Sequence, residues 1–321
     1  MPTETPLVTV RCLVYNHEPF LRQCLDGIVM QQTSFPFEAI VHDDASTDGS
    51  AAIIREYAEK YPDIIKPIYE SENQYSKHDD SIKRAIDAVM NPNTKYSALC
   101  EGDDYWTDPL KLQKQVDFLE SHPDYVICSG NYRCLYQDRG ELDSQGTYDW
   151  LFEKYPNEKQ FFEYSLDNFF DDWWTRTLTC VYRSYGYQDE LVAKGYTELR
   201  DDVYYYNMLT HGKGALLKDI LGVYRVHSGG VWSGNDKTDN IRKQIKNAFD
   251  IYEIEGDRRA FKKIRRCMIN LLGQYKRRRD IKGMCHEFHV FANKAPLAET
   301  LRLISDMMHN AISDSYHRIF K

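Results

Sequence analysis

The chain has 321 residues, of which 42% are hydrophobic and 28% are charged, and its formal net charge is −8 at pH 7. This length fits one large domain, or one of ordinary size with an appendage, and the apolar content is enough for a sizeable core. The negative charge argues against a general nucleic-acid-binding protein.

Residues 1–6 lack the basic and apolar parts of a signal peptide, and no apolar run approaches the roughly 20 residues that span a bilayer. The eight cysteines include no CxxC motif, and several, such as Cys12 and Cys100, lie in apolar runs. This pattern is typical of buried thiols in a reducing compartment. We therefore expect a soluble or peripheral protein of the cytoplasm, with the inner face of the membrane as the location of the peripheral form.

Strand-like and helix-like segments alternate over the first 130 residues. The predicted strands cover residues 7–14, 37–42, 64–69, 96–100 and 125–129. The predicted helices cover residues 18–31, 50–60, 81–90 and 110–121. This alternation predicts a largely parallel sheet with helices on both faces. Right-handed crossovers would bring the loops that follow the strands to one edge, where ligands bind.

The pattern changes after residue 130. Residues 132–196 are irregular and rich in aromatic side chains. The later predicted elements are a helix from Asp202 to Leu209, strands at 215–218 and 222–226, and helices from Asp239 almost to the end. The Gly/Ser/Asn-containing stretch 229–240 separates these parts, so we predict one domain of residues 1–235 and a helical C-terminal extension of residues 236–321.

Positive charge is concentrated in residues 257–282, which contain eleven Lys/Arg and two Asp. The apolar residues of this segment recur at helical spacing: Phe261, Ile264, Met268, Leu271 and Leu272. One interpretation is a peripheral membrane contact through basic C-terminal helices, with phospholipid or a polyprenyl-phosphate carrier as the anionic partner. The alternative, which we favour, is a helix packed on the catalytic domain with a solvated basic face.

Two acidic clusters follow predicted strands. Asp43-Asp44 ends the second strand, and Glu101-Gly102-Asp103-Asp104 ends the fourth, so both are expected at the same sheet edge. Clustered carboxylates suit Mg²⁺ or Mn²⁺, which can bridge a diphosphate, and Gly102 lets the backbone bend closely around a ligand. Solvated acidic turns and helix caps are the alternatives for both clusters.

Five segments, taken in order, resemble the family-2 inverting glycosyltransferases with the GT-A fold, of the bacterial surface-polysaccharide type. These segments are Val10–Asn16, Asp43–Gly49, Glu101–Asp104, Leu199–Asp202 and Tyr224–Ser233. The resemblance spans roughly residues 5–235. It implies a Rossmann-like α/β domain with a mostly parallel central sheet flanked by helices, which transfers a sugar from a nucleotide-diphosphate sugar to a glycan or lipid-linked hydroxyl acceptor.

The resemblance also implies roles for residues at the donor site. Tyr15 would stack on the nucleobase, and Asp43 would accept a hydrogen bond from it, with Asp44 beside it. Lys77 and Arg84 are candidate phosphate contacts.

The metal, Mg²⁺ or Mn²⁺, would be held by the Glu101–Asp104 cluster. Asp103 and Asp104 would bind the ribose, diphosphate and metal, and Glu101 stands where the family usually has Asp. His227 would complete the metal site or contact the diphosphate, with a structural histidine as the alternative.

The resemblance implies that Asp202, preceded by Asp201, is the catalytic base. A metal would stabilise the leaving diphosphate, and Asp202 would take the proton of the attacking hydroxyl in a single displacement that inverts the anomeric centre. This mechanism requires Asp43, Asp103 and Asp202 to lie together in the folded protein.

Three tryptophans are candidates for the acceptor side of the site. Trp232, beside Gly229-Gly230, is a candidate lid residue, and Trp173-Trp174 could stack on sugar faces. Ordinary core packing is the alternative for all three.

Two other functions remain possible at this point. A nucleotidyltransferase would share the sheet and the acidic metal site, but the loop Tyr15–Pro19 after the first strand has no glycine. A non-catalytic nucleotide-sugar-binding protein would be expected to have lost the base, yet Asp202 is present.

Overall fold

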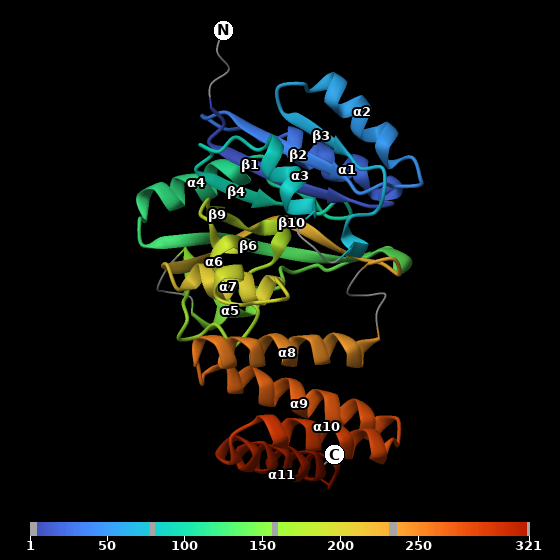
Figure 1. The fold of residues 1–321 in the computed structure, drawn as a ribbon, viewed down its shortest axis with the longest axis vertical. Helices are drawn as coiled ribbons and strands as arrows, with labels where there is room; N and C mark the ends of the chain where they lie inside the picture. The colour runs from blue at the N-terminus through green and yellow to red at the C-terminus, as the bar shows by residue number, and fades with distance from the viewer. Residues whose placement is uncertain (1–4, 78–80, 156–159, 231–235, 320–321) are drawn as a thin grey trace. The chain divides into compact units, whose positions relative to one another are not determined.

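The computed structural model describes residues 5–77, 81–155, 160–230 and 236–319, with side chains as far as residue 309. These residues form two compact units (Figure 1). The first unit consists of Met1–Phe169, Trp173–Tyr187 and Tyr205–Ser228. The second consists of Phe170–Asp172, Gln188–Tyr204 and Gly229–Lys321.

The first unit is built on one mixed sheet, in which the predicted parallel strands are present. Strands β1 (Val8–Val14), β2 (Phe37–Asp43), β3 (Ile65–Tyr69) and β4 (Tyr96–Leu99) lie in the order β3-β2-β1-β4. All three pairings in this run are parallel, so the carboxyl ends of the strands share one edge. β1 lies inside the sheet, between β2 and β4, and its residues Val8, Val10, Cys12 and Val14 are buried.

Beyond β4 the sheet becomes mixed. Its other strands are β5 (Tyr105–Trp106), β6 (Tyr125–Tyr136), β7 (Glu141–Leu142), β8 (Phe161–Tyr164), β9 (Val181–Arg183) and β10 (Lys213–Val226). β9 runs antiparallel to both β4 and β6, whereas β6 and β10 are parallel. The two strands predicted at 215–218 and 222–226 are one strand, β10, whose register with β6 shifts between Leu217 and Gly222.

Helices follow the first strands as predicted. They are α1 (Glu18–Val29), α2 (Ser50–Lys60), α3 (Ser81–Val89) and α4 (Lys111–Ser121). In the described part of the segment between β6 and β10, the α-helices before α7 (Asp201–Leu209) are short. They are α5 (Asp149–Lys154) and α6 (Tyr187–Ala193). α1 lies against β5, where a Cβ on Gly27 would be 2.8 Å from the carbonyl oxygen of Trp106, so only glycine permits this approach.

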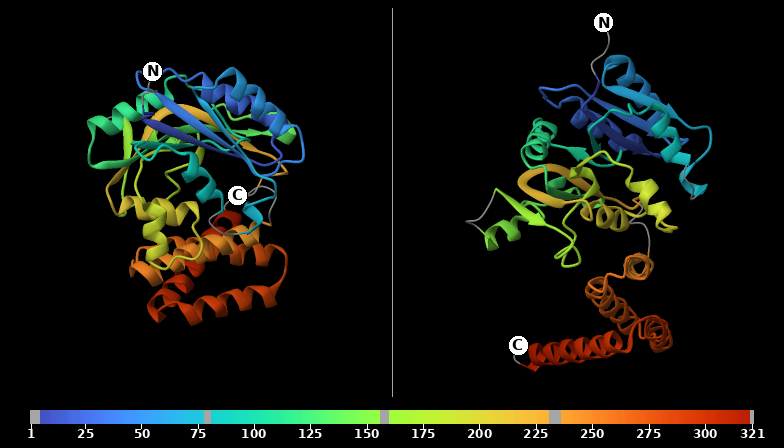
Figure 2. Two further views of the ribbon diagram at one scale, coloured as in Figure 1. Left: turned by 45° about the horizontal axis from the view of Figure 1, so that its top comes forward. Right: turned by 60° about the vertical axis from the view of Figure 1, so that its left-hand side comes forward.

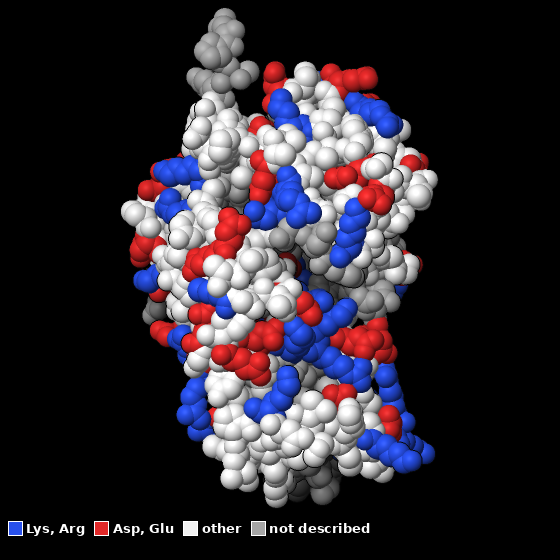
Figure 3. All heavy atoms as spheres, viewed as in Figure 1, with Lys and Arg blue, Asp and Glu red and all other residues white. Residues whose placement is uncertain are grey.

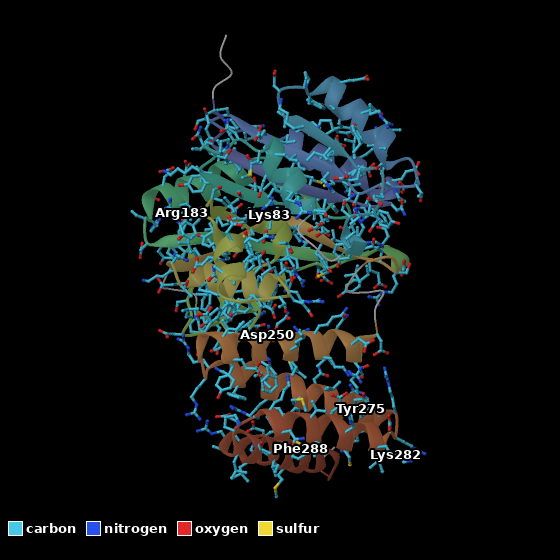
Figure 4. All side chains as sticks on the ribbon, viewed as in Figure 1. Lys83, Arg183, Asp250, Tyr275, Lys282 and Phe288 are labelled. Atoms are coloured by element: carbon cyan, nitrogen blue, oxygen red, sulfur yellow. The ribbon has the colours of Figure 1, made fainter. Side chains whose placement is uncertain are left out.

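The core of the first unit is anchored by buried side chains from distant segments. The Sγ atoms of Cys12 and Cys100 belong to a thiol cluster with Cys24, with Sγ–Sγ distances of 3.8 Å and 3.7 Å to Cys24. Every cysteine of the chain is a free thiol. Arg183 of β9, labelled in Figure 4, donates to the carbonyl oxygens of Tyr125 and Leu119, and so joins β6 to α4.

The second unit consists mainly of four helices, α8 (Lys237–Glu255), α9 (Ala260–Arg277), α10 (Ile281–Lys294) and α11 (Leu297–Ile319), which Figures 1 and 2 show as a layered stack. α9 contacts the other three. The apolar residues that recur in it at helical spacing are buried: Phe261, Ile264, Met268, Leu271 and Leu272. α9 therefore packs its apolar face against the other helices of its own unit, and packing on the catalytic domain stays a prediction.

Polar contacts complete the packing of the C-terminal helices. Tyr275 of α9 (Figure 4) donates to Glu287 of α10 at 3.2 Å and accepts from Arg242 of α8. Within the described parts of the chain, no helix combines the length and apolar character needed to cross a bilayer.

Candidate active site

The loops that follow β1 and β2 are joined by hydrogen bonds of short polar side chains. The Asn16 N–H donates to Ser46 Oγ at 2.9 Å, and the Asn16 side-chain oxygen accepts from the Thr47 N–H at 2.7 Å. Glu18 and Asp48 each accept a backbone N–H from the other's loop. This reciprocal bonding fixes the Tyr15-Asn16 corner, where Asn16 has φ of 55°, next to the end of β2.

The two aspartates that end β2 have different surroundings. Asp44 is buried and accepts the backbone N–H groups of Gln74 and Tyr75 at 2.6 and 3.0 Å, so it holds the loop after β3 in place. One oxygen of Asp43 accepts the Ser46 N–H at 3.3 Å, and the other has no hydrogen-bond partner among the described residues. Asp43 therefore keeps an acceptor for a ligand at this edge.

The turn Glu101–Asp104 lies on the opposite side of β1 from Asp43. The Gly102 N–H donates to the Leu13 carbonyl at 2.9 Å, while the Asp44 N–H donates to the Val14 carbonyl at 2.9 Å. A Cβ on Gly102 would be 2.7 Å from His17 Nδ1, so this position requires glycine. The sheet therefore brings the two acidic clusters to the same end of β1, as the sequence predicted.

Arg225, near the end of β10, holds the Glu101–Asp104 turn in shape. Its backbone N–H donates to Asp104 Oδ1 at 2.7 Å, and its Nε donates to the Asp103 carbonyl at 2.7 Å. Its remaining donors reach Gln137 and Gln23. Burial first, and then the charge of Asp103, raise the pKa of the Asp104 carboxyl well above its usual range.

Asp103 faces two histidines. Its Oδ2 lies 3.0 Å from His227 Nε2 and 4.0 Å from His17 Nε2. Burial would raise the pKa of the Asp103 carboxyl, but the hydrogen bond from His227 and the charges of both histidines outweigh it, and the pKa is lowered. Burial lowers the pKa of His17 in spite of the nearby carboxylate. Asp103 is thus kept ionised in a partly desolvated site.

The donor set around Asp103 fits a divalent cation only in part. A carboxylate and an imidazole are suitable ligands for Mn²⁺ or Mg²⁺. No group of three or more His, Cys, Asp or Glu side chains in the described portion of the chain could hold a metal by itself. These residues therefore fit a cation whose remaining ligands come from a diphosphate and water. Glu101, at the start of the turn, is partly exposed.

The remaining donor-site candidates lie around this edge. The Tyr15 side chain, directly after β1, is 46% exposed, which leaves a ring face for stacking. Lys77 donates to Glu72 and Gln74 within the loop after β3, at 2.6 and 2.9 Å. Arg84 of α3 is exposed and donates to Ser81.

Of the three tryptophans, Trp174 lies in the core, where its Nε1 donates to the Asn168 carbonyl at 2.8 Å. Trp173 is partly exposed, and its ring contacts Tyr205. Trp232 lies outside the described residues.

Asp201 and Asp202 begin α7 and belong to the second unit. Asp201 is exposed, whereas Asp202 is 5% exposed. Asp202 Oδ2 is 3.0 Å from Lys263 Nζ of α9, and its Oδ1 accepts from Asn247 Nδ2 of α8 at 2.7 Å.

The sequence predicted no role for four of these residues: His17, Arg225, Lys263 and Asn247. Arg225 could have been found, because it stands two residues before His227 in a segment already singled out. The other three act on partners far away in the chain, and no local pattern marks them.

The model of glycosyl transferase family 2 matches residues 10–186. An uncharacterised protein of Mycobacterium tuberculosis is 36% identical over 228 residues, which cover 70% of this chain and 60% of that protein. TuaG of Bacillus subtilis, named for glycosyl transfer in teichuronic acid biosynthesis, is 30% identical over 138 residues, 43% of this chain and 51% of its own.

Among solved structures, the mannosyltransferase PcManGT of Pyrobaculum calidifontis, in complex with GDP-Man and Mn²⁺, matches with a TM-score of 0.54. It is 18% identical, and the match covers 99% of this chain and 84% of that one. At this identity the likeness concerns the fold, and it confirms the predicted GT-A architecture. The chain belongs to glycosyl transferase family 2.

Proposed function

We propose that this glycosyltransferase is an inverting, metal-assisted enzyme that moves a sugar from a nucleotide-diphosphate sugar to a glycan or lipid-linked hydroxyl. The observation that carries the proposal is the Asp103–His227 pair, which lies at the sheet edge where the loops bearing Tyr15 and Asp43 also end. Ligands of open α/β sheets bind at this edge.

The nucleotide would bind through the first unit. Tyr15 offers an exposed ring to the base, and Asp43 offers one carboxylate oxygen without a partner among the described residues. Asp44 supports this site from behind, because it holds the loop that carries Lys77. Lys77 and Arg84 are the candidate phosphate contacts.

Asp103 and His227 would hold Mn²⁺ or Mg²⁺ together with the diphosphate oxygens, with Glu101 and Asp104 in the same turn. The ion, when bound, would act as a Lewis acid that stabilises the charge of the leaving nucleoside diphosphate. Arg225 would keep the turn in the geometry that this requires.

Asp202 would act as the base, with Asp201 as its acidic neighbour. It would take the proton of the acceptor hydroxyl while that oxygen attacks the anomeric carbon opposite the diphosphate. One displacement of this kind inverts the anomeric centre. Trp173, Trp174 and Trp232 remain candidates for the acceptor side, with Trp173 favoured over Trp174 because Trp174 is buried.

The names of similar proteins support the donor and acceptor classes. PcManGT is described with GDP-Man and Mn²⁺, and TuaG is named as a glycosyltransferase of teichuronic acid biosynthesis. The chain matches 60% of the length of its mycobacterial relative, so activity and partners are proposed for the described domain.

A membrane or polyprenyl-phosphate contact stays a prediction, as does a cytoplasmic location. Several cations of α9 are paired with acids, including Lys262 with Asp171 and Arg265 with Glu299 and Asp306. The lowest part of Figure 3, over α10 and α11, is mostly uncharged. The exposed apolar residues of α11 include Leu297, Leu301, Ile304 and Met308, so α11 offers more apolar surface than α9 to a bilayer.

A thermal-shift screen of UDP, GDP and dTDP, each with Mn²⁺ and with EDTA, tests the proposal. We expect one nucleoside diphosphate to raise the melting temperature, and only with Mn²⁺. Release of that diphosphate from its nucleotide sugar would then be measured for the wild type and Asp202→Asn. A binding protein without catalysis would show stabilisation but no release, and a nucleotidyltransferase would release pyrophosphate from a nucleoside triphosphate instead.

A further inference from the structure

The carboxylate of Asp202 is held by two helices that follow it by more than 40 residues. Lys263 Nζ lies 3.0 Å from Oδ2, and Asn247 Nδ2 donates to Oδ1 at 2.7 Å. The Val203 N–H also donates to Oδ1, at 3.2 Å. Every one of these contacts lies within the second unit.

This arrangement is buried, which distinguishes it from surface ion pairs. Residue exposure is 5% for Asp202, 7% for Lys263 and 2% for Asn247. Burying a lysine costs desolvation, which a close opposite charge offsets, so the Asp202 carboxylate is the matched partner of Lys263. The Cys267 thiol, one turn further along α9, interacts electrostatically with both charges, and burial raises its pKa.

The Asn247 side chain is oriented toward Asp202, and this orientation is unfavourable for its own amide oxygen. Its Nδ2 faces the carboxylate, and its Oδ1 is buried with no hydrogen-bond partner among the described residues. A buried amide oxygen without a partner is unfavourable. The orientation of the Asn247 side chain is therefore determined by its hydrogen bond to Asp202 and not by the hydrogen bonding of its own oxygen.

The three contacts leave one position on the carboxylate for a proton. Oδ1 accepts two hydrogen bonds within the described structure, and Oδ2 accepts one. Because each carboxylate oxygen has two acceptor positions, Oδ2 retains a lone pair. The proton of an acceptor hydroxyl would go there, as the O–H electron pair forms the new bond to the anomeric carbon and the nucleoside diphosphate leaves with the electrons of the broken C–O bond.

We propose that Lys263 and Asn247 are positioning residues for the catalytic base, so that α8 and α9 are part of the catalytic apparatus and not an appendage. This inference rests on the proposed role of Asp202. It explains why the basic segment places one lysine inside the protein, while its neighbour Lys262 is exposed and pairs with Asp171.

The test compares Lys263→Met, Lys263→Arg and Asn247→Ala with the control Lys262→Met, which removes the adjacent lysine from the same helix. The substrate is the nucleotide sugar of whichever diphosphate the thermal-shift screen selects, and turnover is the release of that diphosphate. Donor affinity is measured separately for each variant by titration.

We expect Lys263→Met to lower kcat by about 100-fold with donor KM and affinity within about 3-fold, since misplacing a catalytic group by about 1 Å has an effect of that size. Lys263→Arg should recover at least about 10-fold of the loss, and Asn247→Ala should lose about 10-fold in kcat. Lys262→Met should match the wild type.

Wild-type kcat in Lys263→Met, or an equal loss in Lys262→Met, would overturn the inference. If Lys263→Met fails to fold, Asn247→Ala alone decides, and an unchanged kcat there overturns it. A fully active Asp202→Asn would instead refute the base assignment, which belongs to the proposed function.

Discussion

His227 Nε2 lies 3.0 Å from Asp103 Oδ2, although the two residues are 124 positions apart in the chain. β10 carries His227 past the end of the sheet, and the turn after β4 presents Asp103 to it. Asp103 and His227 are the residues of the proposed site on which metal binding depends most directly.

Replacing His227 with Ala should remove one of the two proposed protein ligands of the cation. We expect the stabilisation by nucleoside diphosphate and Mn²⁺ to require at least about 10-fold more Mn²⁺. A thermal-shift titration of Mn²⁺ at fixed diphosphate measures this. His289→Ala, which changes an exposed histidine of α10, is the control, and an unchanged Mn²⁺ requirement in His227→Ala would count against the metal site.

Arg225→Lys should disturb the turn that holds Asp103. Lysine has a single charged nitrogen and cannot reach the Asp103 carbonyl, Gln137 and Gln23 together. We expect a loss of about 1–3 kcal/mol in unfolding free energy and weaker binding of the metal–diphosphate complex. Urea denaturation and calorimetry measure the two effects.

Arg22→Lys is the matched control, because Arg22 forms an exposed pair with Glu56 and should cost less than about 1 kcal/mol. Equal stability of the two variants would show that Arg225 does not support the turn.

Tyr15→Ala should weaken nucleotide binding by about 10-fold, which corresponds to the loss of one stacking contact of about 1–2 kcal/mol. Tyr15→Phe keeps the ring and should bind as the wild type does. Isothermal titration of the selected nucleoside diphosphate with Mn²⁺ compares the three proteins. A similar loss in Tyr15→Phe would point to the hydroxyl group, and no loss in either would remove Tyr15 from the donor site.

Lys111 is fully buried, and its Nζ has no hydrogen-bond partner in the described structure, although it lies 4.1 Å from the centre of the Trp106 ring. Burial lowers the pKa of Lys111 to about 8. Since the unfolded chain has the higher pKa, it binds more protons, and the stability of the wild type should rise between about pH 8 and pH 10.

Lys111→Met removes the buried charge and should raise the unfolding free energy at pH 7 by about 1–3 kcal/mol. Its stability should also lose the dependence on pH that Lys111 supplies. Urea denaturation at pH 7 and pH 9.5 tests both statements, and a Met variant less stable than the wild type at pH 7 would contradict them.

The regular part of the fold was predictable because its periodicity is local. α2 has the predicted bounds, and β1, β2 and β3 differ from the prediction by one residue at an end. β6 extends to Tyr136, seven residues beyond its predicted end, because it pairs with β10 along this whole length. The antiparallel β9 has three residues, too few to show a pattern.

The candidate site was predictable where a strand end and a cluster of acids coincide, as at Asp43 and Asp103. The supporting contacts were not. Lys263 resembled any other lysine of a basic helix, and only the packing of α9 shows that it faces Asp202. Asp43 and Asp44 are neighbouring aspartates that the sequence does not distinguish. Of the two, only Asp44 accepts hydrogen bonds from two backbone N–H groups.

The central claim is that this enzyme activates an acceptor hydroxyl with Asp202. The most direct measurement determines donor affinity and diphosphate release on the same preparations of wild type and Asp202→Asn. We predict donor affinity within about 3-fold and turnover reduced by about 10²–10⁴-fold. Turnover by Asp202→Asn at the wild-type rate, with donor bound equally well, would contradict the claim.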